Sequence, residues 1–125
     1  MAFFGLLAGI LTAVWPALPV AATTTERVVT NRYSGLAIEG FDPVAYFTDA
    51  AATQGRPEFE ATGSGAVWRF RNEGNRASFL ARPDVYSPQF GGYDPVGVAR
   101  GVAFSGSPQI WLIVGQRLYL FGGED

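Results

Sequence analysis

Two Asp-Pro pairs are the residues of this chain best suited to chemistry. They lie in two related runs, Gly40-Phe41-Asp42-Pro43-Val44 and Gly92-Tyr93-Asp94-Pro95-Val96. If the two turns meet in the folded chain, the carboxylates of Asp42 and Asp94 would form a pair suited to general acid–base work. An Asp followed by Pro is also a good start for a helix, because Asp caps the first turn and Pro needs no N–H partner there. The sequence leaves both interpretations open.

The side chains that are missing restrict the chemistry further. The chain has no Cys and no His, and all nine of its basic residues are Arg. Zinc, copper, haem and iron–sulfur sites ordinarily need thiolate, thioether or imidazole ligands, and the acidic residues do not have the spacing of a calcium loop. We therefore expect no metal site and no cofactor. His-dependent nucleophilic triads and Schiff-base lysines are excluded as well.

A candidate ligand-binding site can still be assembled from oxygen donors and aromatic rings. Its members are Gly91, Gly92, Tyr93, Asp94, Asp42 and Tyr46. The wider aromatic set could line a pocket, although aromatic residues at strand spacing more commonly form a core; it comprises Tyr46, Trp68, Tyr93, Trp111 and Tyr119. Arg71, Arg76 and Arg100 could hold an anion, but a solvated surface also explains them.

Composition favours one small folded domain. The chain has 125 residues, of which 48% are apolar and 16% charged, and this balance is typical of a folded protein rather than a disordered one. The formal net charge is −2 and the arginines are scattered. Because no basic stripe is present to neutralise phosphates, we expect no nucleic-acid partner.

The N-terminal region has the pattern of an export signal. Residues 1–22 carry no charged side chain, and an apolar run from Phe3 to Val14 is followed by two prolines and then by Val20-Ala21-Ala22. Small residues at such positions suit signal peptidase, so we predict a signal peptide over 1–22 and a flexible leader over 23–32. This places the mature domain in the periplasm or outside the cell, with no stable membrane span after cleavage. An uncleaved anchor is the alternative, but the prolines leave a short apolar stretch for crossing a bilayer.

The elements that must position these residues follow from periodicity and turn chemistry. Helices are predicted to begin at Pro43, after Asn72, and at Pro95, and Pro83 is predicted to end the second of them. Residues 59–62 and 66–71 form one predicted hairpin, and residues 110–114 and 117–121 form another with a type II′ turn at Gly115-Gln116. The fold class is therefore α+β, a small single domain over 33–121 with a tail over 122–125.

The order of several separated motifs resembles a known family. The motifs are Gly35-Leu36-Ala37-Ile38-Glu39-Gly40-Phe41-Asp42-Pro43-Val44-Ala45-Tyr46-Phe47, Trp68-Arg69-Phe70, Asn75-Arg76 with Phe79, Pro83-Asp84-Val85-Tyr86, Pro88-Gln89-Phe90-Gly91-Gly92-Tyr93, Trp111-Leu112-Ile113-Val114 and Leu118-Tyr119-Leu120. Together they resemble the exported YHS-domain (seleno)protein family over nearly the whole mature chain. The resemblance implies a small α+β domain behind a bacterial signal peptide, in a family whose members mostly lack an assigned function.

Three positions depart from the family pattern. Metal-binding relatives in the wider YHS group have cysteines where this chain has Arg71 and Asn75, so the resemblance does not carry a metal site over. The exported branch commonly has cysteine or selenocysteine where this chain has Asp94. A helix N-terminus stabilises a carboxylate as it does a thiolate, so Asp94 would keep the negative charge while losing the redox chemistry of sulfur.

The sequence therefore predicts an exported binding or accessory domain without redox or transition-metal chemistry. Its partner would be an unknown small molecule or an envelope protein. Two alternatives stay open. One is a carboxylate-dependent enzyme using Asp94, with Asp42 as a second acid or base. The other is a structural partner in an envelope complex, which exposed apolar area near the C-terminal hairpin would favour.

Overall fold

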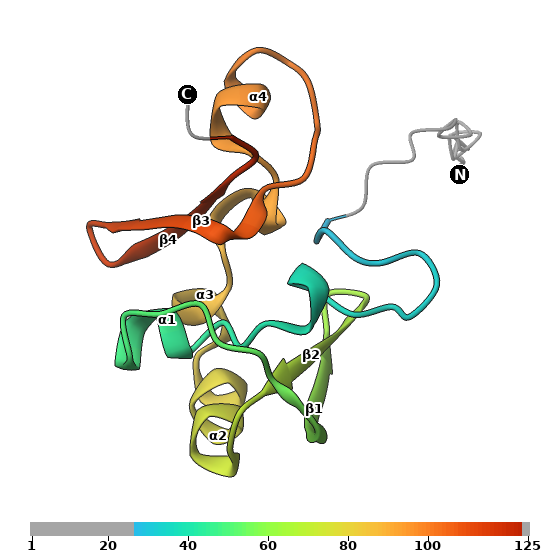
Figure 1. Cartoon of the computed structure of the whole chain (residues 1–125), viewed down its shortest axis with the longest axis vertical. Helices are drawn as coiled ribbons and strands as arrows, with labels where there is room; N and C mark the ends of the chain where they lie inside the picture. The colour runs from blue at the N-terminus through green and yellow to red at the C-terminus, as the bar shows by residue number, and fades with distance from the viewer. Residues whose placement is uncertain (1–26, 124–125) are drawn as a thin grey trace, which may run out of the picture.

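The computed structural model describes residues 27–123, which form two β-hairpins and several short helices (Figure 1). Each hairpin is a separate two-stranded antiparallel sheet. The elements in chain order are η1 (Ile38–Gly40), α1 (Ala45–Thr48), β1 (Arg56–Gly63), β2 (Ala66–Phe70), α2 (Glu73–Ala81), α3 (Pro83–Tyr86), η2 (Gln89–Gly92), α4 (Pro95–Ala99), β3 (Ser107–Val114) and β4 (Arg117–Phe121). The predicted α+β class is confirmed. Between residues 27 and 123, no helix is both long enough and apolar enough to cross a membrane.

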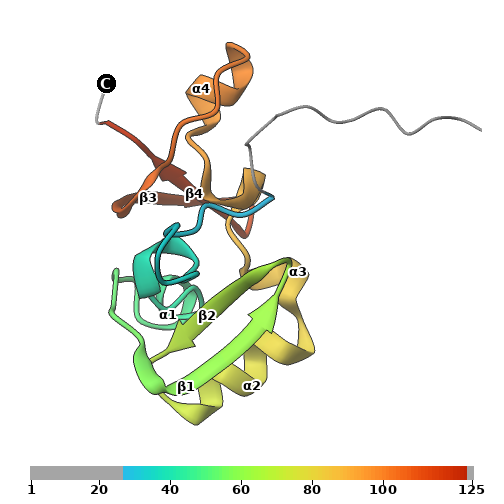
Figure 2. The same ribbon diagram turned by 90° about the vertical axis from the view of Figure 1, so that its right-hand side faces the viewer.

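The first hairpin and α2 form one packed unit. Asn72 caps α2 as predicted, its side chain accepting a hydrogen bond from the Asn75 N–H at 2.7 Å. The helix lies against one face of the hairpin (Figure 2), where the ring centroid of Phe79 is 4.9 Å from that of Trp68 and 5.1 Å from that of Phe70. Trp68 and Phe70 are both fully buried. Burial of large aromatic rings of this kind is the main stabilising contribution to a small domain.

The second hairpin packs its inner face on the rest of the domain. Leu118 and Leu120 are completely buried, and Trp111 and Ile113 on the paired strand pack against the same core. The residues of the turn, Gly115 and Gln116, have φ values of 58° and 63°. Positive φ at both turn positions belongs to a type I′ turn, so the predicted type II′ geometry is wrong although the predicted turn position is correct.

The two halves of the domain repeat one set of backbone hydrogen bonds. Asp42 N–H donates to the Thr53 carbonyl as Asp94 N–H donates to that of Phe104, both at 2.8 Å. The Gly55 N–H donates to Gly40 and the Gly106 N–H to Gly92, also both at 2.8 Å. The two hairpins also share one irregularity of register, between Arg56 and Glu60 and between Ser107 and Trp111. We call residues 37–71 the first repeat and residues 89–122 the second.

The segment before η1 joins the two repeats. Val28 is buried, the Val29 N–H donates to the Gly91 carbonyl at 2.8 Å, and the Val29 carbonyl accepts from the Ile38 N–H at 3.1 Å. A flexible leader was expected to extend to residue 32, but residues 28–31 are part of the fold because their backbone is paired on both sides. The predicted signal peptide and residues 23–26 lie outside the described residues, as do residues 124–125 of the predicted tail.

Several helix boundaries differ from those expected. The first helical carbonyl after Asp42 is that of Val44, which accepts from Phe47 and Thr48 N–H, so α1 begins at Ala45 rather than Pro43. Pro83 ends α2 as predicted, but it also begins α3, because proline suits the first turn of a new helix.

Candidate functional site

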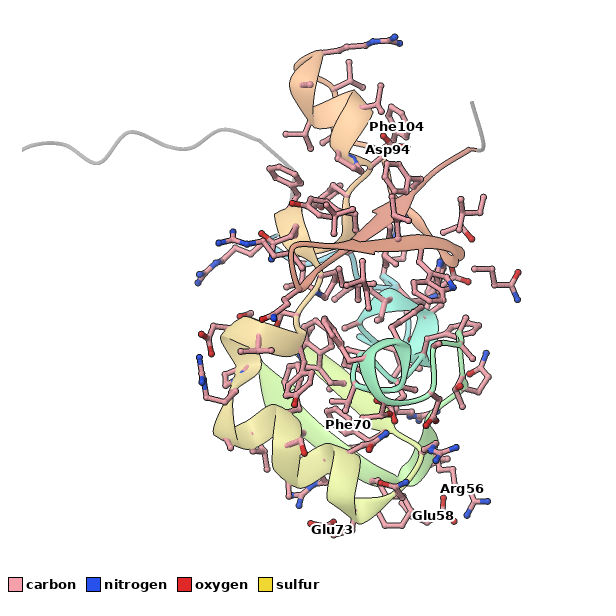
Figure 3. The ribbon with its side chains drawn as sticks, turned by 90° about the vertical axis from the view of Figure 1, so that its left-hand side faces the viewer. Arg56, Glu58, Phe70, Glu73, Asp94 and Phe104 are labelled. Carbon is pink, nitrogen blue, oxygen red and sulfur yellow. The ribbon has the colours of Figure 1, made fainter. Side chains whose placement is uncertain are left out.

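Asp94 links the start of α4 to the end of β4. Its Oδ1 accepts hydrogen bonds from the N–H groups of Val96 at 2.7 Å and Gly97 at 3.0 Å, as an N-cap does. Its Oδ2 accepts from the Gly122 N–H at 2.6 Å. The side chain lies at the base of α4 (Figure 3) and is only 5% exposed. The cap predicted at this position is therefore present, with a third, long-range contact added to it.

These donors hold Asp94 in its charged form. The Gly122 N–H contributes most to lowering the pKa of the carboxyl, and the N–H groups of Gly97 and Val96 and the positive charge of Arg100 lower it further against the effect of burial. A general base works best when its pKa lies near the working pH. The pKa of Asp94 is instead lowered, and both of its carboxylate oxygens already accept hydrogen bonds from backbone N–H groups. It therefore has the properties of a buried structural anion.

Asp42 is held in the same way in the first repeat. Its Oδ1 accepts from Val44 N–H at 2.8 Å and Ala45 N–H at 3.3 Å. Its Oδ2 accepts from the Arg71 N–H and from the Asn75 side-chain amide, both at 2.8 Å, and the residue is fully buried. Positions 71 and 75, singled out by the family pattern, thus converge on a single carboxylate.

The two carboxylates do not act on each other. Among residues 27–123, the donors to Asp42 come from residues 44–75 and the donors to Asp94 come from residues 96–122, so each carboxylate serves its own repeat. An acid–base pair would need the two groups to share a substrate or a proton. The hydrogen bonds instead explain why the Asp-Pro motif occurs twice: each Asp ties a helical turn to the end of a hairpin.

The glycines of the candidate loop are covered by the chain itself. A Cβ atom on Gly91 would overlap the carbonyl of Arg27, and one on Gly92 would lie 3.2 Å from Ile38 Cγ2. Both glycines also have positive φ, 66° and 93°, which side chains rarely adopt. Tyr93 is half-buried, and its backbone pairs with that of Ser105. These contacts give the loop a structural role, and ligand binding there stays a prediction.

Tyr46 belongs to the core. It is 1% exposed, its hydroxyl donates to the Pro108 carbonyl at 2.6 Å, and its ring packs edge-on against Trp111 at 5.2 Å. Burial, helped by the negative charges of Asp42 and Glu39, raises the pKa of the phenol. The hydroxyl therefore joins α1 to β3 as a neutral donor.

Two of the three candidate arginines, Arg71 and Arg76, have separate acidic partners. Arg71 pairs with Asp49 at 3.0 Å, whereas Arg76 donates to the Glu60 carbonyl at 2.7 Å and pairs with Glu73 at 3.2 Å. Arg100 follows the last turn of α4. Convergence on one anion is therefore not seen for these side chains.

Two hollows of the surface lie away from the candidate residues. Two open hollows of about 460 Å³ each are formed, one by residues 27–35 with the β1–β2 turn and one by α3 with the β3–β4 turn. None of the six candidate ligand-binding residues lines either of them. Over the part of the chain that the structure describes, acidic side chains do not gather in groups of three that could hold a metal ion.

The sequence raised exposed apolar area near the C-terminal hairpin without assigning residues to it; the structure places such an area on the outer face of β3–β4, which we define as Leu112, Val114, Tyr119 and Phe121. Leu112 and Val114 are 52% and 54% exposed, and the two aromatic residues are half-buried. Leu112 pairs directly with Tyr119 across the hairpin, so the side chains share one face. The signal was present, since every residue from Ile110 to Val114 is apolar. A strand with one solvent-exposed face would instead show apolar and polar residues in alternation.

Comparison of the chain with protein-family models, with curated proteins and with solved structures finds no match. Assignment of a function therefore starts from the contacts described above.

Proposed function

We propose that this chain is an exported YHS-like accessory domain that serves as a protein partner in an envelope complex, without redox or transition-metal chemistry. The observation that carries the proposal is the exposed outer face of β3–β4. Single exposed apolar residues are common on protein surfaces, but a contiguous group of them marks an interaction site.

Further apolar side chains support this choice. The ring of Phe90 packs at a tilt against that of Tyr119, with centroids 6.4 Å apart, and Phe90 is itself half exposed. Phe104, also about half exposed, lies beside Asp94 at the base of α4 (Figure 3). Aromatic residues of this kind contribute most of the binding energy in protein–protein interfaces.

The carboxylate enzyme is less well supported. Asp94 would need a free oxygen and a raised pKa to act as a base, but its oxygens accept three backbone N–H groups. The nucleophile role has the same obstacle. Binding by an exposed surface requires neither property.

The support for export comes from the sequence. The uncharged stretch over 1–22 ends on Val20-Ala21-Ala22, which suits signal peptidase. The absence of cysteine means that the domain needs no oxidising compartment to fold, and it needs no reducing one either. Periplasmic location therefore remains part of the proposal.

Site-specific photo-crosslinking in intact cells tests the proposal. A photoreactive amino acid at position 112 is expected to yield a discrete adduct with another envelope protein. The same amino acid at Leu80, which is 51% exposed on α2, is the matched control and is expected to yield none. Equal adducts from both positions, or none from position 112, would contradict the proposal. Stabilisation of the protein by stoichiometric zinc, copper or haem in a thermal melt would contradict its chemical part.

A further inference from the structure

We infer that the hollow between residues 27–35 and the β1–β2 turn binds a phosphate monoester group, held by Arg27 and Arg32. The inference goes beyond the proposed function, because no residue of the outer face of β3–β4 lines this hollow. Its volume of about 460 Å³ is within the range of small-molecule sites, about 300–1,000 Å³. The lining residues that carry the argument are Arg27, Asn31, Arg32, Gly35, Ser64 and Gly65.

Backbone hydrogen bonds hold the walls of the hollow in place. The Gly35 N–H donates to the Asn31 carbonyl at 2.8 Å, and the Asn31 N–H donates to the Leu36 carbonyl at 3.0 Å. This closed turn is joined to the first hairpin, since the Val67 N–H donates to the Gly35 carbonyl at 2.9 Å just after the β1–β2 turn. A ligand would therefore meet a backbone that is already ordered, which lowers the entropic cost of binding.

The charge of the hollow is positive. Two guanidinium groups line it, and none of its lining residues is acidic. Among residues 27–123, the ion pairs between side chains are made by four other arginines: Arg69, Arg71, Arg76 and Arg82. Within this part of the chain, Arg27 and Arg32 therefore have no carboxylate partner that an incoming anion would have to displace.

Neighbouring groups orient the donors of the hollow. The guanidinium carbon of Arg32 lies 5.7 Å from the centre of the Tyr33 ring, a cation–π distance that restricts this long side chain. Asn31 Oδ1 accepts from the N–H groups of Tyr33 at 2.8 Å and Ser34 at 2.9 Å. Because its oxygen is used in this way, the Asn31 side chain presents its NH2 group as a donor. Ser64 adds a hydroxyl group from the β1–β2 turn.

A phosphate monoester fits this set of donors better than a carboxylate does. It carries a charge of about −1.5 to −2 at pH 7 and three acceptor oxygens, so it matches two guanidinium groups and still accepts from a neutral donor. A carboxylate has one charge and two oxygens, which would leave one guanidinium without a counter-charge. A Cβ atom on Gly35 or Gly65 would meet no atom within 4 Å, so there is room for the organic part of the ester.

Glycerol phosphate is the soluble probe of this site. It is titrated into the isotope-labelled full chain at constant ionic strength and followed by NMR. Saturable shifts of the Gly35, Ser64 and Gly65 amide signals are expected. Acetate at the same ionic strength is the comparison anion and is expected to give no saturable shift.

A second arm distinguishes a soluble ester from a lipid headgroup. Phosphatidic acid carries a phosphate monoester, so co-sedimentation of the protein with phosphatidylcholine vesicles is measured with and without phosphatidic acid. Saturable binding of glycerol phosphate would identify the ligand as a soluble ester. Binding only to vesicles that contain phosphatidic acid would identify it as a lipid headgroup. Both results support a phosphate site in this hollow.

Arginine variants connect the response to the hollow. Arg27→Gln and Arg32→Gln are each expected to weaken binding about tenfold, the change that loss of a charged hydrogen bond produces. Both residues are exposed, so the fold should be retained. Arg100→Gln is the matched control, because it removes the same charge from an exposed position that does not line the hollow, and it should leave the affinity unchanged.

Four results would overturn the inference. They are no saturable response to either phosphate carrier, an equal response to acetate, an affinity that Arg27→Gln and Arg32→Gln leave unchanged, and an equal loss of affinity in Arg100→Gln. The last would show a general effect of charge rather than a site. The proposed function is tested separately at position 112, so its failure and the failure of the phosphate site are distinguishable.

Discussion

Replacing each buried carboxylate by its amide distinguishes the two Asp-Pro turns by the number of donors that they satisfy. In Asp94→Asn, the remaining carbonyl can still cap α4, but the new NH2 group faces the Gly122 N–H, so one buried donor loses its acceptor. In Asp42→Asn, two donors lose theirs, the Arg71 N–H and the Asn75 amide. Hydrogen bonds to charged groups contribute about 1.5–3 kcal/mol each. We expect Asp94→Asn to cost about 2 kcal/mol and Asp42→Asn about 4 kcal/mol.

Urea unfolding at pH 7, followed by tryptophan fluorescence, measures these costs as shifts of the midpoint at constant slope. Asp84→Asn is the control for loss of a negative charge, because Asp84 is exposed and forms a surface ion pair with the neighbouring Arg82. The urea midpoint of this variant should stay close to that of the unchanged protein. A loss of about 4 kcal/mol is a large fraction of the total stability of a small domain. Asn75→Ala therefore provides a milder test of the same contact, with an expected cost of about 1–2 kcal/mol.

Equal costs for the two amide variants would refute the reasoning, since they would show that the second donor on Asp42 contributes nothing. A neutral Asp94→Asn would refute it as well. Combining Asp42→Asn with Asn75→Ala gives a further check, because both changes remove the same hydrogen bond. Their joint effect should be smaller than the sum of the two.

Three further predictions concern pH and packing. The pKa of Asp94 is lower in the folded state than in the unfolded state. The charged carboxylate therefore stabilises the fold fully above the unfolded pKa of about 4, and this stabilisation is lost as the pH falls through the folded pKa. In Asp94→Asn, urea midpoints measured from pH 7 down to pH 2 should accordingly fall less steeply at the acid end. The pKa of Tyr46 is raised in the folded state, so the free energy of unfolding should decrease as the pH rises above about 10, and Tyr46→Phe should lessen this decrease. At pH 7 the same variant should cost about 1 kcal/mol, because it loses the hydrogen bond to the Pro108 carbonyl. Finally, a Cβ on Gly106 would overlap the backbone of β4, so Gly106→Ala should cost about 2 kcal/mol, whereas Gly123→Ala, with open space around it, should leave the thermal midpoint unchanged.

Local signals in the sequence were enough to locate most elements. The Asn72 cap, the stop at Pro83 and the Asp94-Pro95 helix start all depend on contacts within four residues, and the structure confirms each of them. The hairpins were found from apolar runs and turn residues, although their first strands begin earlier than expected, at Arg56 and Ser107.

Long-range contacts account for what the sequence did not predict. The contact of Asp42 with Arg71 and Asn75 joins residues about thirty positions apart, and no local pattern announces it. The type I′ turn at Gly115-Gln116 depends on a non-glycine residue adopting positive φ, which residue preference argues against. The role of Asp94 was open at the sequence level because a cap and a reactive carboxylate use the same local motif; its burial and the Gly122 N–H decide between them.

The backbone hydrogen bonds of Val29 bear on the resistance of the protein to proteolysis. Its N–H and carbonyl connect the second repeat to the first through Gly91 and Ile38. A cut after Ala22 would spare this connection, whereas exopeptidase trimming beyond Val29 would remove both hydrogen bonds in a single step. Side chains such as Tyr46, bonded to Pro108, would then have to keep the halves together. The turnover of the protein should therefore depend on how far its N-terminal residues are eroded, with residue 29 as the boundary.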